Sequence, residues 1–377
     1  MDKRRLFGAF CFAIECYFAI LYLLLFVEAG EAMLNYVVRR LLLLPLVLLG
    51  VTLIAFSMIW LLGPGVLVSA YIQNPRALDK APDTYERLVA KYGLDQPLAI
   101  RYWKWLQNVV KGDWGYSLVA KDKVSIAISH RLAPTLELTI ISGIIIVLLG
   151  MWIGTLMAGK YGSWFDKIIS VFSMIGWSIP EFITGLLVFL VFLKLFHWIP
   201  VGLASAETYD IVNSPQWNSY THSLIIDSFL NGNFVVLGNA LLNLIEPVLT
   251  LVIMWTCYIM RITRTSIVEI MHLDYIRTAR AKGLEEEKVL KKHARRNALI
   301  SVVTISGNVF VYLLAGAVIV ESIFNRPGLG RFIAAASARK DFISVIATTF
   351  YIGIIAVLMN LLVDIIYTII DPRVRLN

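Results

Sequence analysis

Gly154, Gly159 and Lys160 have the G-x-x-x-x-G-K spacing of a loop that binds the phosphates of ATP. In such a loop a Ser or Thr follows the lysine and coordinates Mg²⁺, but Tyr161 stands there in this sequence. The two glycines also fall at the end of an apolar run, without the strand that should precede them. We interpret the match as a coincidence and expect no ATP hydrolysis by this chain.

Other residue patterns that carry out chemistry are missing from the sequence. It contains no G-x-S-x-G and no H-E-x-x-H, and its five histidines are scattered over different segments. The three cysteines, Cys11, Cys16 and Cys257, lie in apolar runs without the spacing of a metal site or a disulfide framework. We therefore expect no catalytic residues, cofactor or metal ion in the chain itself.

The composition is that of an integral membrane protein. Of the 377 residues, 58% are apolar and 16% are charged, whereas soluble domains have roughly 45–50% and about 25%. Lys and Arg exceed Asp and Glu by 34 − 26 = 8. In a membrane protein such an excess reflects cytoplasmic loops beside anionic lipid, so we expect membrane lipid and no nucleic acid as a partner.

Seven apolar stretches are long enough to cross a bilayer as helices, which takes about 20 residues each. They are approximately 6–27, 41–62, 135–159, 168–196, 241–260, 300–323 and 343–370. Residues 64–133, between the second and third stretches, are too polar to cross, and we expect them to form a small, mostly helical domain in water.

The distribution of Lys and Arg predicts the orientation. There is none from Leu195 to Met260, but there are ten from Arg261 to Asn297. Because short basic loops stay in the cytoplasm, we expect 261–297 inside and 197–240 outside. A topology of six core helices, with the start of the first and the end of the last in the cytoplasm, agrees with the basic residues of every short loop. It places 64–133 outside.

Residues 1–32 do not fit this topology, because basic residues at both ends of the first apolar stretch would have to lie on the same side. Three interpretations remain open. The segment is signal-like, cleaved or retained; or it is an extra helix with an outside N-terminus; or translation begins at Met33.

The basic loop 274–297 reads D-Y-I-R-T-A-R-A-K-G-L-E-E-E-K-V-L-K-K-H-A-R-R-N. This pattern predicts two short amphipathic helices separated at Gly283, since glycine readily adopts the left-handed conformation that ends a helix. Glutamates begin the second helix and basic residues end it, which complements the helix dipole. Taken alone, the pattern is equally typical of a charged loop that anchors helices at the lipid surface.

Residues 277–283, R-T-A-R-A-K-G, resemble the cytoplasmic coupling motif of binding-protein-dependent ABC-transporter permeases of the oligopeptide/dipeptide type. Other segments resemble the same family in the same order: 33–62, 93–99 (G-L-D-Q-P-L-A), 112–118 (G-D-W-G-Y-S-L), 320–332 (with F-N-R-P-G-L-G-R) and 360–373 (ending in D-P-R). The chain departs from the family at Glu246-Pro247, where Leu-Pro is usual, and residues 1–32 have no family counterpart.

This resemblance implies an all-α integral membrane protein with the type I ABC importer permease fold. Six core transmembrane helices are expected, with or without an extra N-terminal helix, together with a small helical extracytoplasmic domain. The expected divisions are the N-terminal segment 1–32, the first core helix 33–63, the outer domain 64–133 and the permease core 134–377, which contains the coupling loop 274–297.

The resemblance also implies a permease subunit of the cytoplasmic membrane that imports oligopeptides by alternating access. Its expected partners are a second homologous permease, two cytoplasmic ATPase subunits that bind ATP and Mg²⁺, and an extracytoplasmic substrate-binding protein. Import of oligosaccharides by the same machinery is the alternative. A more distant one is a secondary transporter or channel without an ATPase, although the sequence has neither internal repeats nor a chain of buried protonatable groups.

For the coupling contact with an ATPase subunit, the resemblance indicates Asp274, Tyr275, Arg277, Thr278, Ala279, Arg280, Lys282, Gly283 and Leu284. We expect the small Ala279 and Gly283 to permit close approach. We expect the basic side chains to pair with acidic groups of the partner.

Two further groups of residues are candidates for function. Glu246 and Glu181 each adjoin a proline within an apolar stretch, and ionisable residues there are candidates for a substrate pathway. Five aromatic residues of the outer domain form either a docking surface for the binding protein or, the interpretation that we favour, the packing of that domain: Tyr102, Trp103, Trp105, Trp114 and Tyr116.

Overall fold

The computed structural model describes residues 33–69, 83–197 and 202–370. Its described part is almost entirely helical, apart from the two-stranded antiparallel hairpin β1 (Tyr116–Ser117) and β2 (Asp122–Lys123). We refer to residues 64–133, which are expected outside the membrane, as the outer segment; it contains α3 (Gly63–Ser69) from its second residue on, α5 (Asp83–Tyr92) and α6 (Leu98–Val110). The long helices are α2 (Met33–Trp60), α7 (Val124–Gly159), α12 (Phe234–Met271), α15 (Arg295–Ile323) and α17 (Phe342–Ile370). The other elements are α8 (Trp164–Ser178), α9 (Glu181–Phe196), α10 (Ala206–Val212), α11 (Leu224–Leu230), α13 (Asp274–Ala281), α14 (Glu286–Lys288), the π-helix η1 (Val289–Ala294) and α16 (Leu329–Ala338).

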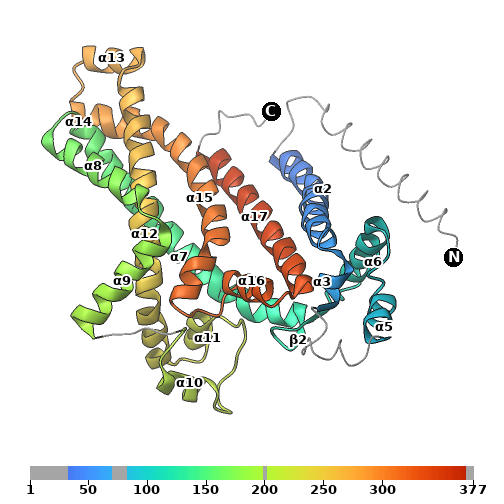
Figure 1. The fold of residues 1–377 in the computed structure, drawn as a ribbon. Helices are drawn as coiled ribbons and strands as arrows, with labels where there is room; N and C mark the ends of the chain where they lie inside the picture. The colour runs from blue at the N-terminus through green and yellow to red at the C-terminus, as the bar shows by residue number, and fades with distance from the viewer. Residues whose placement is uncertain (1–32, 70–82, 198–201, 371–377) are drawn as a thin grey trace.

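Helix α12 is the central element of the fold. It packs against α7, α15, α8 and α9, and it runs from α10 and α11 at one end of the molecule to α13 at the other (Figure 1). The largest apolar core lies along α12, α7 and α15 and includes Leu138, Leu251 and Leu313. The segment with α10 and α11, expected outside, and the basic loop, expected inside, therefore lie at opposite ends of α12.

Within the described residues, four helices are long and apolar enough to cross a membrane alone, and two bent pairs raise the number to six if each pair is one crossing. The four are α2, α7, α12 and α17. The all-α fold with several transmembrane helices, predicted from the sequence, is confirmed. The first apolar stretch, 6–27, lies outside the described residues.

The stretch 168–196, which is long enough to cross a bilayer as one helix, is broken in the structure. It consists of α8 and α9, whose axes differ by 104° across a break at Ile179 and Pro180. Proline lacks the N–H that a continuing helix needs and disfavours helical geometry in the preceding residue. Accordingly, Ile179 is extended, with ψ 126°.

Glycines allow α7 and α12 to approach each other closely. A Cβ atom built on Gly154 would lie 2.6 Å from the backbone oxygen of Met260 and 2.6 Å from Cβ of Thr263. Gly150 is similarly close to Ile259. Gly154 therefore lies inside a continuous α-helix and allows close helix packing. This role explains the presence of a glycine at the position that resembled part of a phosphate-binding loop.

We predict that Gly154→Ala destabilises the protein although alanine favours helices. Replacing glycine by alanine inside a helix increases stability by up to about 1 kcal/mol. Overpacking a tight interface lowers stability by about 1–3 kcal/mol. Thermal unfolding of the detergent-solubilised protein should show a lower midpoint for Gly154→Ala. Gly238→Ala is the matched control, because Gly238 also lies inside a long helix, the neighbouring α12, and has no atom within 4 Å of the added Cβ. An unchanged or raised midpoint for Gly154→Ala would contradict the packing role.

Candidate functional site

The basic loop forms a separate cap at one tip of the molecule. Helix α12 ends at Met271, and α13 begins three residues later, lying across the tip beyond the end of α12 (Figure 1). The chain then passes through α14 and η1 directly into α15. The break at Gly283 was predicted correctly. The second helix is not separate as expected, because η1 continues without interruption into a long helix of the core.

The inner face of α13 is buried against the rest of this chain. Ile276 is fully buried, and Ala279 is 7% exposed. They pack in one apolar cluster with Ile267 of α12 and Val289 of η1. The small side chain of Ala279 therefore permits close approach within the chain, and it is not at the surface where we expected it to meet a partner.

The outer face of α13 is exposed and combines apolar and basic groups. Leu273, Tyr275 and Leu284 are 48%, 40% and 38% exposed. Exposed polar and small residues surround them: Asp274, Arg277, Thr278, Lys282 and Gly283. We refer to these eight residues as the tip surface. Such a mixture of aromatic, aliphatic and Arg residues is typical of protein–protein contacts.

Hydrogen bonds fix the tip surface to the core. The Arg280 guanidinium donates from Nε to Glu286 Oε1 at 2.6 Å and from Nη2 to Glu286 Oε2 at 3.2 Å. The amide of Asn297, in α15, donates to the Tyr275 hydroxyl at 2.7 Å. Arg280 is thus engaged within the chain, and Arg277 pairs with Asp274 at 3.2 Å. Both pairs are at least partly exposed, and such pairs contribute only about 0–1 kcal/mol.

Gly283 makes the turn that ends α13. Its φ is +77°, and no atom lies within 4 Å of a Cβ built there. The backbone N–H of Gly283 donates to the Arg280 carbonyl at 2.9 Å. Space is therefore available for a side chain, but the left-handed conformation strongly favours glycine.

The two intramembrane glutamates lie in different surroundings. Glu246 is fully buried in α12, and neither carboxyl oxygen has a hydrogen-bond partner among the described residues. Glu181 begins α9 and is half-buried, and its Oε1 also has no partner in the described part of the chain. Because the Glu246 carboxyl reaches no surface in this conformation, any contact with a substrate would require the surrounding helices to move.

A buried cluster of charged residues, not identified from the sequence, joins the elements at the opposite end. Arg326 is 2% exposed, and its Nη2 lies 3.3 Å from Glu137 Oε2 of α7. Glu321, fully buried at the end of α15, accepts hydrogen bonds from Thr135 Oγ1 at 2.6 Å and from the backbone N–H of Arg331 at 2.9 Å. Burial lowers the pKa of the Arg326 guanidinium, while both carboxylates act against that change.

This cluster gives a physical reason for the segment F-N-R-P-G-L-G-R. Arg326 supplies the buried cation, and a side chain on Gly328 would collide with the Glu321 carboxyl group. The backbone N–H of Leu329 donates to Thr135 Oγ1 at 2.8 Å. The motif was visible in the sequence, but its acidic partner Glu137 is 189 residues away in the chain and could not be identified by spacing.

A second ion pair joins two elements near the tip. Arg264 of α12 donates from Nη2 to Asp166 Oδ2 of α8 at 2.8 Å, and the backbone N–H of Gly162 donates to the same oxygen at 3.0 Å. Asp166 is almost completely buried. The loop between α7 and α8 is thereby attached to the same helix that carries α13.

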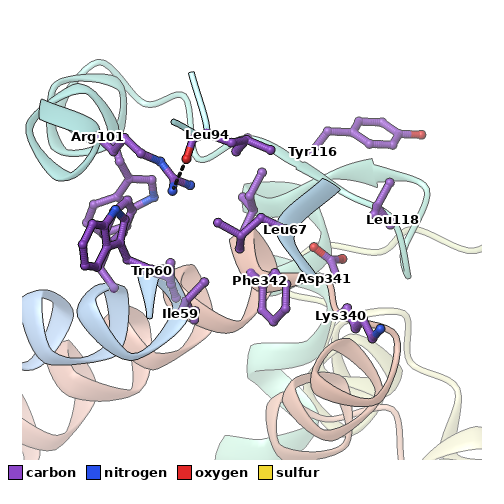
Figure 2. A pocket seen from close by; sticks show the side chains of 15 residues that line it. Ile59, Trp60, Leu67, Leu94, Arg101, Tyr116, Leu118, Lys340, Asp341 and Phe342 are labelled. Atoms are coloured by element: carbon purple, nitrogen blue, oxygen red, sulfur yellow. Dashed lines mark hydrogen bonds between the residues drawn. The ribbon is translucent and has the colours of Figure 1, made fainter. Parts of the chain in front are cut away.

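In the outer segment, aromatic residues pack the domain against the membrane helices. Tyr102 and Trp105 of α6 contact Phe56 of α2, while Trp114 contacts Tyr351 of α17 at a ring distance of 4.7 Å. The packing interpretation is therefore correct for these three. Tyr116 is exposed and lines a cavity of about 330 Å³ with apolar side chains of α2, α3 and α17 (Figure 2).

Comparisons with known proteins match almost the whole described chain. Residues 146–376 match the family described as "Binding-protein-dependent transport system inner membrane component". Residues 33–139 match the N-terminal region of a binding-protein-dependent transport system membrane component.

The matches to individual relatives span most of the length of those proteins. A peptide transport system permease protein of Brucella abortus (strain 2308) is 37% identical over 295 residues, 78% of this chain and 86% of that protein. The glutathione transport system permease protein of Salmonella typhimurium (strain LT2) is 35% identical, with 91% of this chain and 99% of that protein covered. Among solved structures, an inward-facing MetNI methionine ABC transporter gives a TM-score of 0.44 at 16% identity, covering 63% of this chain and 93% of that one.

Proposed function

This chain belongs to the family of binding-protein-dependent transport system inner membrane components, and from that membership we propose how its geometry serves import. The chain is a permease subunit of an ABC importer and a multi-pass protein of the inner membrane. We propose that α13 is its coupling helix. The observation that supports this most directly is the tip surface, an exposed apolar and basic face on a short helix that is rigidly joined to α12 and α15.

The proposed coupling depends on the attachments of α13. Its buried face packs on α12, and η1 connects it without a loop to α15. A displacement of α13 therefore acts on two helices that share the main apolar core. Packed interfaces move as rigid bodies rather than deforming continuously, which is the requirement of alternating access.

The proposed contact with an ATPase subunit uses the tip surface and excludes Ala279. The exposed apolar groups Leu273, Tyr275 and Leu284 are expected to supply most of the contact energy. Arg277 and Lys282 are expected to orient the partner, because exposed charges contribute more to specificity than to affinity. ATP and Mg²⁺ would be bound by two such ATPase subunits and not by this chain.

We propose an oligopeptide as the cargo. The relatives are named for peptide transport and for glutathione transport, and glutathione is itself a small peptide. No observation on the described residues favours an oligosaccharide or a mechanism without an ATPase. A second permease chain is expected to complete the pore. An external binding protein is expected to deliver the peptide to the face formed by the outer segment and by α10 and α11.

We predict that a cysteine replacing Thr278 forms a cross-link to the ATPase subunit in the assembled transporter. Thr278 is exposed in the middle of the tip surface and donates only to the backbone carbonyl of Asp274. Cross-linking in membranes with a short reagent that joins a thiol to a primary amine, followed by mass spectrometry, tests this contact. The yield of the cross-link should change with the bound nucleotide. Peptide uptake by the same variant should persist before the reagent is added and stop afterwards.

The matched control is Lys111→Cys, an exposed position at the end of α6 in the outer segment. It is expected to form no cross-link with the ATPase subunit. If Thr278→Cys also forms none under any nucleotide condition, while the transporter remains assembled and active, the assignment of α13 as the coupling helix fails.

A further inference from the structure

A cleft of about 680 Å³ opens between the last turns of α7 and the segment that runs from α14 through η1 into α15. One wall is formed by Leu148, Met151, Trp152, Thr155, Leu156 and Gly159 of α7, and the other includes Leu290 and Leu299. The rim carries Lys160, Glu287, Lys291 and Arg295. None of these residues belongs to the tip surface.

The cleft combines an apolar wall with a basic rim. Leu148 and Trp152 are 58% and 61% exposed, so the wall is open to whatever surrounds α7. The rim has three cations and one carboxylate, which gives a formal charge of 3 − 1 = +2. Glu287 pairs with Lys291, and the Lys160 ammonium lies 5.1 Å from the centre of the Phe165 ring.

The apolar wall and the basic rim of the cleft lie at different depths along α7. Leu148, Trp152 and Leu156 belong to the long apolar helix that crosses the membrane. Lys160 caps that helix and lies beyond its last turn. At about 1.5 Å of rise per residue, Leu148 lies roughly 18 Å from Lys160 along the helix. The cleft therefore extends from hydrocarbon depth to the level of the lipid headgroups.

We propose that this cleft binds an anionic phospholipid of the inner leaflet. The phosphate lies against Lys160, Lys291 and Arg295, and one acyl chain follows Leu148, Trp152 and Leu156. Basic residues on the cytoplasmic side of transmembrane helices attract anionic headgroups. The proposal depends on the inside orientation of the basic loop and not on the identity of the cargo.

The chemistry of the wall favours a lipid chain over a peptide in transit. Its polar groups are the indole of Trp152 and the hydroxyl of Thr155, and the latter already donates to the Met151 carbonyl at 2.6 Å. A peptide backbone would lose its hydrogen bonds to water on entering such a wall, which is unfavourable. An acyl chain has no such groups to satisfy.

The test is native mass spectrometry of the complete transporter, purified in mild detergent and titrated with phosphatidylglycerol or phosphatidylcholine. We expect the wild type to retain phosphatidylglycerol selectively. Each basic group near an anionic lipid contributes roughly a fivefold factor in affinity, so Lys160→Gln/Arg295→Gln should weaken binding by about 25-fold. The matched control, Lys288→Gln/Lys292→Gln, removes two exposed cations of the same loop that do not line the cleft, and it should bind like the wild type.

A second measurement identifies the occupant directly. A photoreactive benzoylphenylalanine placed at Trp152 should form an adduct with the mass of a phospholipid in native membranes. Equal retention of both lipids, unchanged affinity in Lys160→Gln/Arg295→Gln, or an adduct with a second permease chain would each overturn the proposal. In the last case the cleft is part of the interface between subunits.

Discussion

Gly283→Arg is expected to leave the chain inserted in the membrane but to abolish ATP-driven peptide uptake. Gly283 has φ +77°, and an L-residue in the left-handed region costs about 1–2 kcal/mol. The turn would open or shift, and α13 would lose the connection that holds the tip surface in place. The added side chain would also project from the surface proposed to contact the ATPase subunit. Uptake by vesicles and the amount of protein in the membrane should be measured together.

Two controls separate backbone strain from a disrupted contact. Gly162→Arg adds the same side chain at φ +78°, also without an atom within 4 Å of the new Cβ, but in the loop between α7 and α8. If uptake requires an intact tip surface, Gly162→Arg should retain most of the uptake. Gly283→Asn should also remain active, because asparagine tolerates the left-handed conformation. Full uptake by Gly283→Arg would count decisively against the coupling role of α13.

Arg326→Met is expected to reduce the stability of the folded protein more than any other single change considered for this chain. Its guanidinium is 2% exposed and is the cation that faces Glu137. Removing one partner of a buried ion pair typically costs about 3–5 kcal/mol, because the remaining charge is left without compensation. The folded fraction after solubilisation and the thermal midpoint should both fall.

The double variant Arg326→Met/Glu137→Gln is expected to recover part of the lost stability, since it removes the uncompensated carboxylate as well. Arg339→Met, at the exposed C-terminal end of α16, controls for the loss of an arginine from the same region. If Arg326→Met and Arg339→Met unfold at the same temperature, the buried cluster does not stabilise the fold.

The sequence supported the prediction of the fold class and of transmembrane helices because those features depend on local composition. Apolar stretches of the length of a bilayer predicted transmembrane helices, and the long helices α7 and α12 include two of them. Gly283 similarly marked the end of α13, since the conformational freedom of glycine is a property of one residue. The family resemblance through R-T-A-R-A-K-G is confirmed by the match of residues 146–376. The contact of that motif with an ATPase subunit remains a prediction.

Other features depend on which segments meet in space. The burial of Ala279 follows from the packing of α13 on Ile267 and Val289. The amphipathic pattern indicates that α13 has one apolar face, but it does not indicate which segments cover that face. The bend between α8 and α9 depends on how far the surrounding helices allow Pro180 to redirect the chain. Glu246 could be recognised as unusual, but only the packing around α12 determines that its carboxyl group is fully buried.

The amino-acid sequence by itself thus determined that this chain spans the membrane, which loops are expected in the cytoplasm, and where the glycine that ends α13 lies. Those properties follow from transfer free energies and backbone preferences that act residue by residue. Only the tertiary structure decided which segments cover the apolar face of α13, that Arg326 pairs with Glu137, and that Lys160 and Arg295 share one cleft. Such contacts join residues up to almost 200 positions apart, and their energies exist only after the helices have packed.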